Sequence, residues 1–235
     1  MKKIFKIPND WVYRGEGNCH IVLGLPKLNK VLRIRKRDRP KTFLEWFLYF
    51  IEDYITWWYD FGANAENRDL SFHLKIMRPL LGAKYVSDAK QVKLSKIQVG
   101  KIEKQLCHIR PDFRKHNILH YGRATLFHDF TTLETDDLPI KLSNDVFSVE
   151  IKPKKGWVPF REKNFPECIF CMNQYIKLET GKISEPSCYC PRNLFSGVET
   201  EMKRCILSLI DNPQNNIRIF KMVICFMMKT KINSR

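Results

Sequence analysis

The amino-acid sequence predicts an α+β protein with two lobes, the first built on an antiparallel sheet with helices and the second mostly helical. Strand-like alternation of apolar and polar residues dominates up to residue 153, and helical periodicity dominates from Cys168 onward. Strands that come first and helices that come later are typical of α+β proteins. With 235 residues, of which 44% are hydrophobic, the chain is long enough to bury a sizeable core.

Three strands are expected near the N-terminus, at 10–14, 20–25 and 29–37. The first two are joined by the glycine-containing segment GEGNC, which predicts a hairpin. In the third strand Arg33 and Arg35 share one face, because side chains alternate along a strand.

Residues 42–63 predict an amphipathic helix with aromatic side chains at intervals of three or four positions. These aromatic residues are Phe43, Phe47, Phe50, Tyr54, Trp57 and Phe61. Glu45, Glu52 and Asp53 interrupt the apolar run, which therefore falls short of the ~20 residues that a membrane span needs. We expect the aromatic stripe to face the core.

A second short helix is expected at 70–82, ended by Pro79 and Gly82, and the segment 86–111 combines a strand with a basic helix. The later elements are strands at 124–133 and 146–153, followed by helices within 170–182 and 199–216.

The composition indicates an acidic partner. Lys and Arg number 41 against 25 Asp and Glu, which gives a net charge of +16 at pH 7. Such an excess on a folded protein favours nucleic acid, an anionic membrane surface or a polyphosphate as the partner. The first residues show no secretory signal pattern, so we expect a cytoplasmic or nuclear protein whose eight cysteines are reduced.

The hairpin segment GEGN is a candidate phosphate-binding turn. Gly15 and Gly17 leave backbone N–H groups open to an anion because no Cβ stands in the way. Arg33 lies on a nearby strand, where a phosphate-pairing cation is expected. The alternative is an ordinary hairpin turn, since the segment lacks the third glycine and the lysine of the established nucleotide motifs.

The segment VEIKPKKGWVP places an acid and several lysines at the end of a strand. Glu150 and Lys152 share one side of that strand, and the proline that follows stiffens the exit that carries Lys154. Lysines on a rigid backbone beside one carboxylate predict a site for several phosphates and one hydroxyl group. The alternative is a solvent-exposed edge strand with protective lysines, although Ile151 and Trp157 indicate a packed corner.

The cysteine pairs Cys168-x-x-Cys171 and Cys188-x-Cys190 resemble a four-thiolate zinc site. The second pair has one intervening residue where two are usual. We expect buried thiols without a bound metal. A zinc ion here is the alternative, and it would be structural.

The segment NPQNNIRIF at 212–220 offers Asn215, Asn216 and Arg218 as the lining of a polar pocket. The alternative is a helix stop followed by turn-forming asparagines.

Taken in this order, these motifs resemble the inositol-pentakisphosphate 2-kinase family. The matching segments are WVYRGEGN at 11–18, VLRIRK at 31–36, EIKPKKG at 150–156, CIFCMNQ at 168–174, Lys177, YCPRNLFSG at 189–197 and PQNNIRIF at 213–220. The resemblance implies a distant relative of the protein-kinase fold. It also implies transfer of the γ-phosphate of ATP to the 2-hydroxyl of inositol 1,3,4,5,6-pentakisphosphate, which gives inositol hexakisphosphate, or phytate.

The resemblance assigns roles to individual residues. The implied nucleotide-binding residues are Gly15, Gly17, Asn18, Arg33, His128, Asp129 and Glu150. The implied inositol-phosphate-binding residues are Arg114, Lys152, Lys154, Lys177 and Asn215. Arg218 is expected near the transferring phosphate as the catalytic cation. The magnesium ligands are expected in a later part of the family pattern that this chain does not match.

The same resemblance divides the chain into lobes. The expected parts are a nucleotide-binding lobe at 1–130 with an insertion at 42–66, the start of an inositol-phosphate-binding lobe at 131–220, and a divergent tail at 221–235. The family's late aspartates find no counterpart, so an inactive, C-terminally truncated fragment is one expectation. A catalytically inactive kinase-derived scaffold and a basic nucleic-acid-binding module are the alternatives. The kinase hypothesis predicts a monomer with no membrane partner and disfavours nucleic acid.

Overall fold

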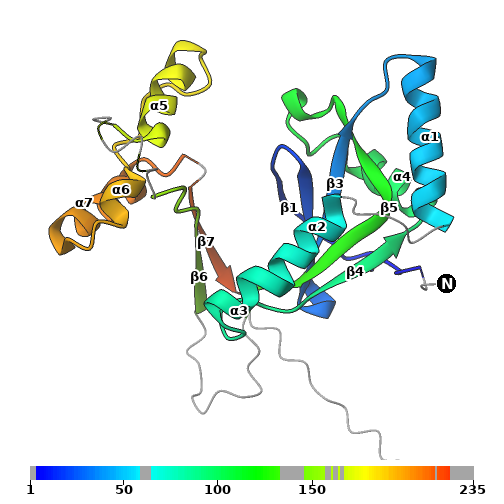
Figure 1. The fold of residues 1–235 in the computed structure, drawn as a ribbon, viewed down its shortest axis with the longest axis horizontal. Coiled ribbons are helices and arrows are strands. Elements are labelled where there is room, and N and C mark those ends of the chain that lie inside the picture. The colour runs from blue at the N-terminus through cyan, green and yellow to red at the C-terminus, as the bar shows by residue number, and fades with distance from the viewer. Residues whose placement is uncertain are drawn as a thin grey trace, which may run out of the picture. The chain divides into compact units, whose positions relative to one another are not determined.

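The computed structural model describes residues 4–58, 65–132, 146–156, 160, 164, 167–214 and 216–222. The chain divides into two compact units, Met1–Asp129 and Phe130–Arg235, each with its own antiparallel sheet (Figure 1). Helices accompany the sheet in both units, which confirms the predicted α+β class. None of the described helices is long and apolar enough to cross a lipid bilayer.

The N-terminal unit is built on a five-stranded antiparallel sheet with strand order β1-β2-β3-β5-β4. Its strands are β1 (Val12–Glu16), β2 (His20–Leu25), β3 (Lys30–Asp38), β4 (Ala89–Leu94) and β5 (Asn117–His128). The alternation at 20–25 and 29–37 predicted β2 and β3 to within one residue at each end. The strand expected from residue 124 begins earlier, at Asn117.

The described part of this unit contains four α-helices. They are α1 (Phe43–Trp58), α2 (Ala65–Phe72), α3 (Arg78–Leu81) and α4 (Lys96–Leu106), with a π-helical turn at His73–Met77 and 3-10 turns at Pro26–Leu28 and Asp112–Arg114. The expectation that Pro79 ends the second helix is wrong. Pro79 stands in the first turn of α3, where a proline fits the helix, and Gly82 (φ 92°) follows its end.

The core of the N-terminal unit lies on one face of the sheet, against α4. Ile21 and Leu23 of β2 and Leu32 and Ile34 of β3 are fully buried there, because alternate side chains of each strand point to that face. Apolar residues of α4 complete this core, namely Val99, Ile102 and Leu106. The other face of the sheet is crossed by α2 (Figure 1).

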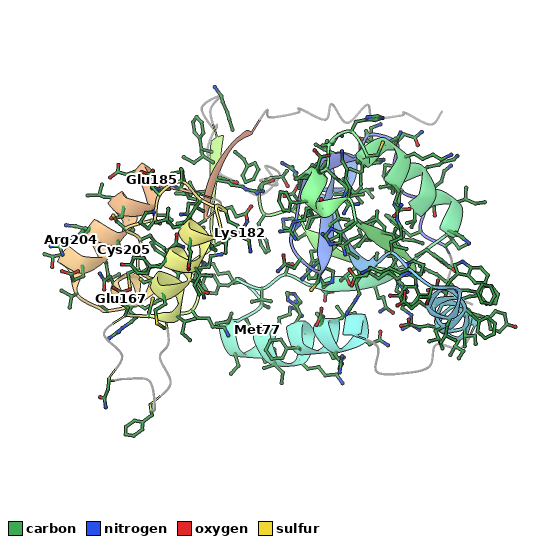
Figure 2. All side chains as sticks on the ribbon, turned by 90° about the horizontal axis from the view of Figure 1, so that it is seen from above. Met77, Glu167, Lys182, Glu185, Arg204 and Cys205 are labelled. Atoms are coloured by element: carbon green, nitrogen blue, oxygen red, sulfur yellow. The ribbon has the colours of Figure 1, made fainter. Side chains whose placement is uncertain are left out.

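Helix α1 contradicts the expectation of a buried aromatic stripe. Phe43 is 79% exposed, Phe50 51% and Tyr54 54%, whereas Asp53 is buried. Figure 2 shows side chains of α1 standing out on the side of the helix away from the sheet. The side chains of Trp57 and Phe61, two other members of the expected stripe, lie outside the described residues. Periodicity alone identified an amphipathic helix but not the face that turns inward.

The C-terminal unit contains a two-stranded antiparallel sheet of β6 (Val146–Ile151) and β7 (Ile217–Met222). Its helices are α5 (Ile169–Glu179), α6 (Pro191–Leu194) and α7 (Glu199–Asp211). The buried side chains of Tyr189, Cys205 and Leu209 form its core. Strand β7 was not predicted, because the turn signal of the preceding asparagines masked a short alternating segment.

Candidate functional site

The glycine turn between β1 and β2 has the backbone shape that glycine favours. Gly15 adopts φ 143°, and the pairing of β1 with β2 shifts register between Tyr13 and Gly15. The Gly17 N–H donates to the His20 carbonyl at 2.9 Å and closes the turn. A Cβ built on Gly17 would meet nothing within 4 Å. Packing does not require a glycine there, so its small size leaves room for a group that approaches from outside.

A buried ionic cluster lies directly behind the turn. Both oxygens of the Glu16 carboxylate accept hydrogen bonds from Arg110, each at 3.0 Å, and Lys36 donates to the same carboxylate at 2.6 Å. The Glu16 side chain is 2% exposed. Burial raises the pKa of Glu16, but the hydrogen bonds from Arg110 and Lys36 outweigh it and lower that pKa overall. Sequence reasoning passed over this cluster, although its acid stands inside GEGN.

The cluster also fixes Arg114, a predicted phosphate-binding residue. Arg110 donates to the Arg114 carbonyl at 2.6 Å, and the Arg114 guanidinium donates to the Asn18 side-chain oxygen at 2.7 Å. This contact is exposed, so Arg114 lies at the mouth of the glycine turn. Asn18, which the resemblance assigns to the nucleotide, and Arg114, which it assigns to the inositol phosphate, are therefore neighbours.

Arg33 and His20 line a pocket of about 300 Å³ between the sheet and the helix that crosses it. The Arg33 guanidinium lies 3.0 Å from His20 Nδ1, and Asp69 of α2 lies 4.0 Å from the other ring nitrogen. Burial, followed by the positive charge of Arg33, lowers the pKa of His20 to about 4. His20 is therefore neutral at physiological pH and can accept the hydrogen bond that orients Arg33. The sequence did not indicate this role.

The predicted nucleotide-binding residues His128 and Asp129 are the last two residues of the N-terminal unit. His128 ends β5 opposite Lys30. Asp129 is buried, its carboxylate pairs with Arg14 at 3.1 Å, and its N–H donates to the Asn29 carbonyl. The Asp129 side chain is thus held within the fold.

The C-terminal unit brings Glu150 and Arg218 together. They face each other across the β6–β7 ladder, and directly opposite residues of an antiparallel pair point to the same face of the sheet. The ladder continues past β6, because the Lys152 N–H donates to the Asn216 carbonyl at 2.7 Å. Arg218, the residue predicted to be catalytic, thus lies opposite Glu150, the acid of the segment EIKPKKG.

Three predicted phosphate-binding lysines gather beside this ladder. Burial, followed by the positive charges of Lys152 and Lys177, lowers the pKa of Lys154. The Lys152 ammonium lies 3.9 Å from the Glu150 carboxylate. Lys177 comes from the last turn of α5, so the cluster depends on tertiary structure. Several like charges held close together, with Glu150 as the neighbouring acid, are a favourable arrangement for a ligand with several phosphates.

The segment 152–156, called the lysine corner below, is rigid. The sequence shows only part of the reason. Lys154 adopts φ 59°, a left-handed conformation that costs energy for a residue with a Cβ. The buried Tyr189 donates from its hydroxyl to the Pro153 carbonyl at 2.7 Å. A Cβ on Gly156 would lie 2.0 Å from the Phe195 ring. Tyr189 and Phe195 therefore pack the corner, whereas Ile151 is 44% exposed.

Two predicted members of this site, Trp157 and Asn215, lie outside the described residues. The residues before and after position 215 are both described. Gln214 donates to the Gln174 side-chain oxygen at 2.9 Å, and the Asn216 side chain is buried with its oxygen unpaired.

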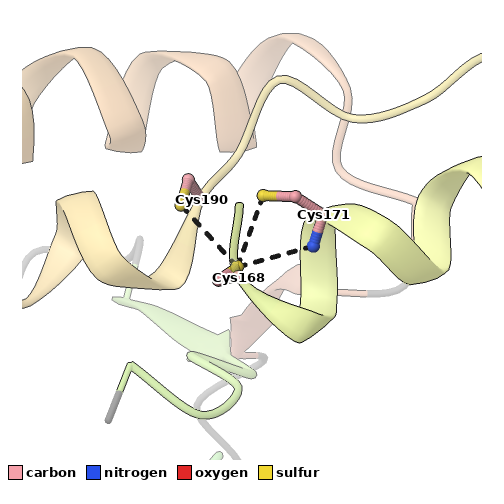
Figure 3. Close-up of side chains that lie close together, drawn as sticks. All are labelled: Cys168, Cys171 and Cys190. Atoms are coloured by element: carbon pink, nitrogen blue, oxygen red, sulfur yellow. Dashed lines mark hydrogen bonds between the residues drawn. The ribbon is translucent and has the colours of Figure 1, made fainter. Parts of the chain in front are cut away.

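Three of the four predicted zinc ligands form a cluster. The sulfurs of Cys168, Cys171 and Cys190 all lie within 4.8 Å of one another (Figure 3). The Cys168 sulfur is 3.4 Å from that of Cys171 and 3.8 Å from that of Cys190. Sulfurs around a tetrahedral zinc ion with bonds of ~2.3 Å are about 3.8 Å apart, so the spacing fits a thiolate metal site. Cys188 is exposed and does not belong to the cluster.

The thiols of the cluster are shifted in opposite directions. Burial raises the pKa of Cys168, but hydrogen bonds from Cys171 and Cys190 outweigh it and lower that pKa overall. Burial, followed by the neighbouring sulfurs, raises the pKa of Cys171. Cys205, labelled on α7 in Figure 2, donates from its thiol to the Cys190 carbonyl at 3.1 Å. The seven described cysteines are free thiols in the structure.

A comparison with protein families decides the wider assignment. The sequence model of the family described as Inositol-pentakisphosphate 2-kinase matches residues 13–233. The chain belongs to the inositol-pentakisphosphate 2-kinase family. The match includes the glycine turn, the lysine corner and the cysteine cluster.

Curated relatives carry the same family name. An inositol-pentakisphosphate 2-kinase of Danio rerio is 34% identical over 225 residues, which cover 91% of this chain and 43% of the relative. The Arabidopsis thaliana protein of that name is 30% identical over 240 residues, covering 92% of this chain and 52% of the relative. The chain therefore spans about half the length of the curated relatives that it matches.

Proposed function

We propose that this chain provides the nucleotide-binding and inositol-phosphate-binding residues of an ATP-dependent kinase. The acceptor of the phosphoryl group is the 2-hydroxyl of inositol 1,3,4,5,6-pentakisphosphate, and the product is inositol hexakisphosphate. The single observation that carries the proposal is the cluster of Lys152, Lys154 and Lys177 beside the Glu150–Arg218 pair. An acceptor with five phosphates needs several cations at fixed positions.

The inositol-phosphate side depends on charge and rigidity. Lysine ammonium groups bind phosphates as point charges, and the fixed backbone around Lys154 limits the conformational entropy lost on binding. Glu150 is suited to accept a hydrogen bond from a ligand hydroxyl, since an ionised carboxylate is only an acceptor. Arg218 is suited to stabilise negative charge that develops on a transferring phosphoryl group.

The nucleotide side depends on the glycine turn and the pocket next to it. Gly17 leaves open space above the turn, and the pocket of about 300 Å³ is lined by Arg33 and the neutral His20. Both features support binding of a phosphate-bearing nucleotide. Arg114, at the mouth of the turn, adds a further cation.

Magnesium is the metal that we propose for this kinase, and it would neutralise charge on the nucleotide phosphates. The motif matches in this sequence supply cations and a glycine turn, but among them we assign no pair of carboxylates for the metal and the acceptor hydroxyl. Positioning and electrostatics provide most of the catalysis in phosphoryl transfer. We therefore expect the 235 residues by themselves to bind both ligands and to turn over several orders of magnitude more slowly than a kinase in which both carboxylates are in place.

Calorimetry and a phosphorylation assay test the proposal together. Titration with inositol pentakisphosphate and with a non-hydrolysable ATP analogue should give saturable binding of each. Product formation from inositol pentakisphosphate, ATP and magnesium should be slow or absent, and turnover comparable to that of a relative would refute the expected rate. If the chain binds neither ligand but bulk RNA changes its electrophoretic mobility, and this change disappears at high salt, the chain is a nucleic-acid-binding module instead.

A further inference from the structure

Helix α1 has the reverse of the burial pattern expected for an ordinary surface helix. Among the side chains that the structure describes in this helix, 43–55, Asp53 is buried, Tyr49 is half-buried and the others are exposed. A helix on the surface of a globular protein normally buries its apolar face and exposes its charges. Here a carboxylate faces the body of the protein, and aromatic and aliphatic side chains face outward.

The inward orientation is fixed by strong contacts. Arg37 of β3 holds both oxygens of the Asp53 carboxylate, at 2.9 and 2.7 Å, and His120 of β5 donates to it at 3.0 Å. The Arg37 guanidinium also lies over the Tyr49 ring, 4.6 Å from its centre. Bidentate charge-assisted hydrogen bonds of this kind are directional, so they hold the helix in one rotation about its axis.

The helix also has a well-formed start. The Thr42 hydroxyl accepts from the Glu45 N–H at 3.1 Å, while the Glu45 carboxylate accepts from the N–H groups of Lys41 and Thr42. This arrangement is a capping box in which Glu45 satisfies the first turn. One of the acids of α1 is therefore engaged at its N-terminus.

The outward face is large and continuous. Phe43, Trp46 and Phe50 form a stacked row, with ring centres 5.7 and 5.9 Å apart. The exposed apolar side chains of α1 are Phe43, Leu44, Trp46, Phe47, Leu48, Phe50, Ile51, Tyr54 and Ile55, each between 37% and 79% exposed. Contiguous apolar surface of this kind marks an interaction site.

Positive charge stands next to this face. Arg39 and Lys41 are exposed and immediately precede the helix, at the end of the basic run RIRKRDRPK. The whole chain carries a net charge of +16. Two copies of the chain would repel each other, whereas an anionic surface would attract it. An apolar face of Phe, Trp and Leu side chains with Arg and Lys nearby is typical of helices that lie in a membrane interface.

We propose that α1 binds the surface of an anionic phospholipid membrane. Its aromatic face lies at the boundary between headgroups and acyl chains, and Arg39 and Lys41 contact lipid phosphates. The helix has 16 residues and is about 24 Å long, so it lies along the surface rather than across the ~30 Å hydrocarbon layer. This proposal departs from the sequence-based expectation of no membrane partner. It does not depend on the proposed kinase function, because it uses neither the glycine turn nor the lysine corner.

Co-sedimentation with vesicles tests the proposal on the 235-residue chain. The chain should pellet with vesicles of phosphatidylcholine and phosphatidylserine at low salt, and much less with phosphatidylcholine alone. Trp46→Ser combined with Phe47→Ser, and separately Arg39→Glu combined with Lys41→Glu, should each lower the partition coefficient by about tenfold or more. All four positions are exposed, so folding should be retained, as checked by circular dichroism.

Matched controls separate α1 from other surfaces. Phe113→Ser removes an aromatic ring that is 70% exposed elsewhere, and Lys27→Glu with Lys84→Glu reverses two other exposed charges. These variants should bind as the unmodified chain does. Lys152→Ala with Lys154→Ala should also bind vesicles normally, and soluble inositol pentakisphosphate should not release the protein.

Three results would overturn the proposal. The first is equal binding to neutral and anionic vesicles, or binding to neither. The second is normal vesicle binding by the Trp46→Ser/Phe47→Ser variant. The third is a concentration-dependent dimer that dissociates in this variant and does not bind lipid, which would make the face an interface between copies of the chain.

Discussion

The two charged clusters of this protein differ in how their charges are balanced. In the N-terminal unit, Glu16 is buried and holds Lys36 and Arg110. In the C-terminal unit, the charges acting on Lys154 are those of Lys152 and Lys177, which are both positive. The first cluster is a buried acid held between two cations, whereas the second gathers three lysines near a single acid, Glu150, at the surface.

This difference separates a structural role from a binding role. A buried, fully hydrogen-bonded cluster stabilises one backbone arrangement and offers nothing to a ligand. Exposed lysines on a strained, rigid corner gain favourable partners only when an anion arrives. The glycine turn lies directly in front of the buried cluster, so in each unit a rigid support positions groups that a phosphate ligand could contact.

Removal of the buried acid should give the largest effect. Glu16→Gln would leave Lys36 and Arg110 buried beside a neutral group, and breaking a buried ion pair in this way costs about 3–5 kcal/mol of stability. Urea unfolding of the variant would measure the loss. Asp112→Asn, which removes an almost fully exposed carboxylate paired with Lys115, is the control and should leave the midpoint unchanged. A Glu16→Gln variant as stable as the unmodified protein would show that the cluster is not structural.

Removal of a surface lysine should affect binding and spare the fold. Lys154→Ala should weaken affinity for inositol pentakisphosphate by about 1.5–3 kcal/mol, the typical contribution of a charge-assisted hydrogen bond. Its stability should stay the same or rise slightly, because a repulsive charge is lost. Calorimetry measures the affinity, with the exposed Lys203→Ala on α7 as the matched control. Equal affinity in both variants would contradict a binding role for the corner.

His20 should make stability depend on pH within a defined window. Its pKa is about 4 in the folded protein and about 6.5 when unfolded, so the unfolded chain binds the proton more tightly. Stability is therefore complete above pH 6.5 and falls as the pH drops toward 4, by about 1–2 kcal/mol near pH 5. Denaturation at several pH values, with His20→Gln subtracted as a reference, measures this loss. Identical profiles for both proteins would show that His20 does not titrate in this window.

The cysteine cluster provides a third comparison, because it gathers sulfurs that a cation would bind as thiolates. We expect purified protein to carry about one zinc ion per chain, with Cys171→Ser losing it and Cys188→Ser retaining it. A chelator should lower the melting temperature by a few degrees, equivalent to about 1 kcal/mol, since Tyr189 and Cys205 already pack this region. Metal analysis that finds no zinc in a folded sample would leave buried thiols as the explanation.

The sequence predicted those features that depend on local pattern. Regular alternation located β2 and β3, and the motifs identified the glycine turn and the lysines of the corner. Contacts between distant residues could not be read in this way. Glu16 and Arg110 are 94 positions apart, and the proximity of Lys177 to the corner requires α5 to fold back toward β6. Asp53 illustrates the same limit, because only its tertiary partners determine which face of α1 turns inward.

The pairing of β6 with β7 has a consequence for the order of folding. Glu150 and Arg218 meet only after α5, α6 and α7, which lie between the two strands, have been synthesised. Closing so long a loop is entropically costly and slow compared with the formation of a hairpin such as β1–β2. On the ribosome the lysine corner therefore emerges well before the strand that pairs with it. The glycine turn can form early during translation, while the lysine corner is completed among the last contacts of the described chain.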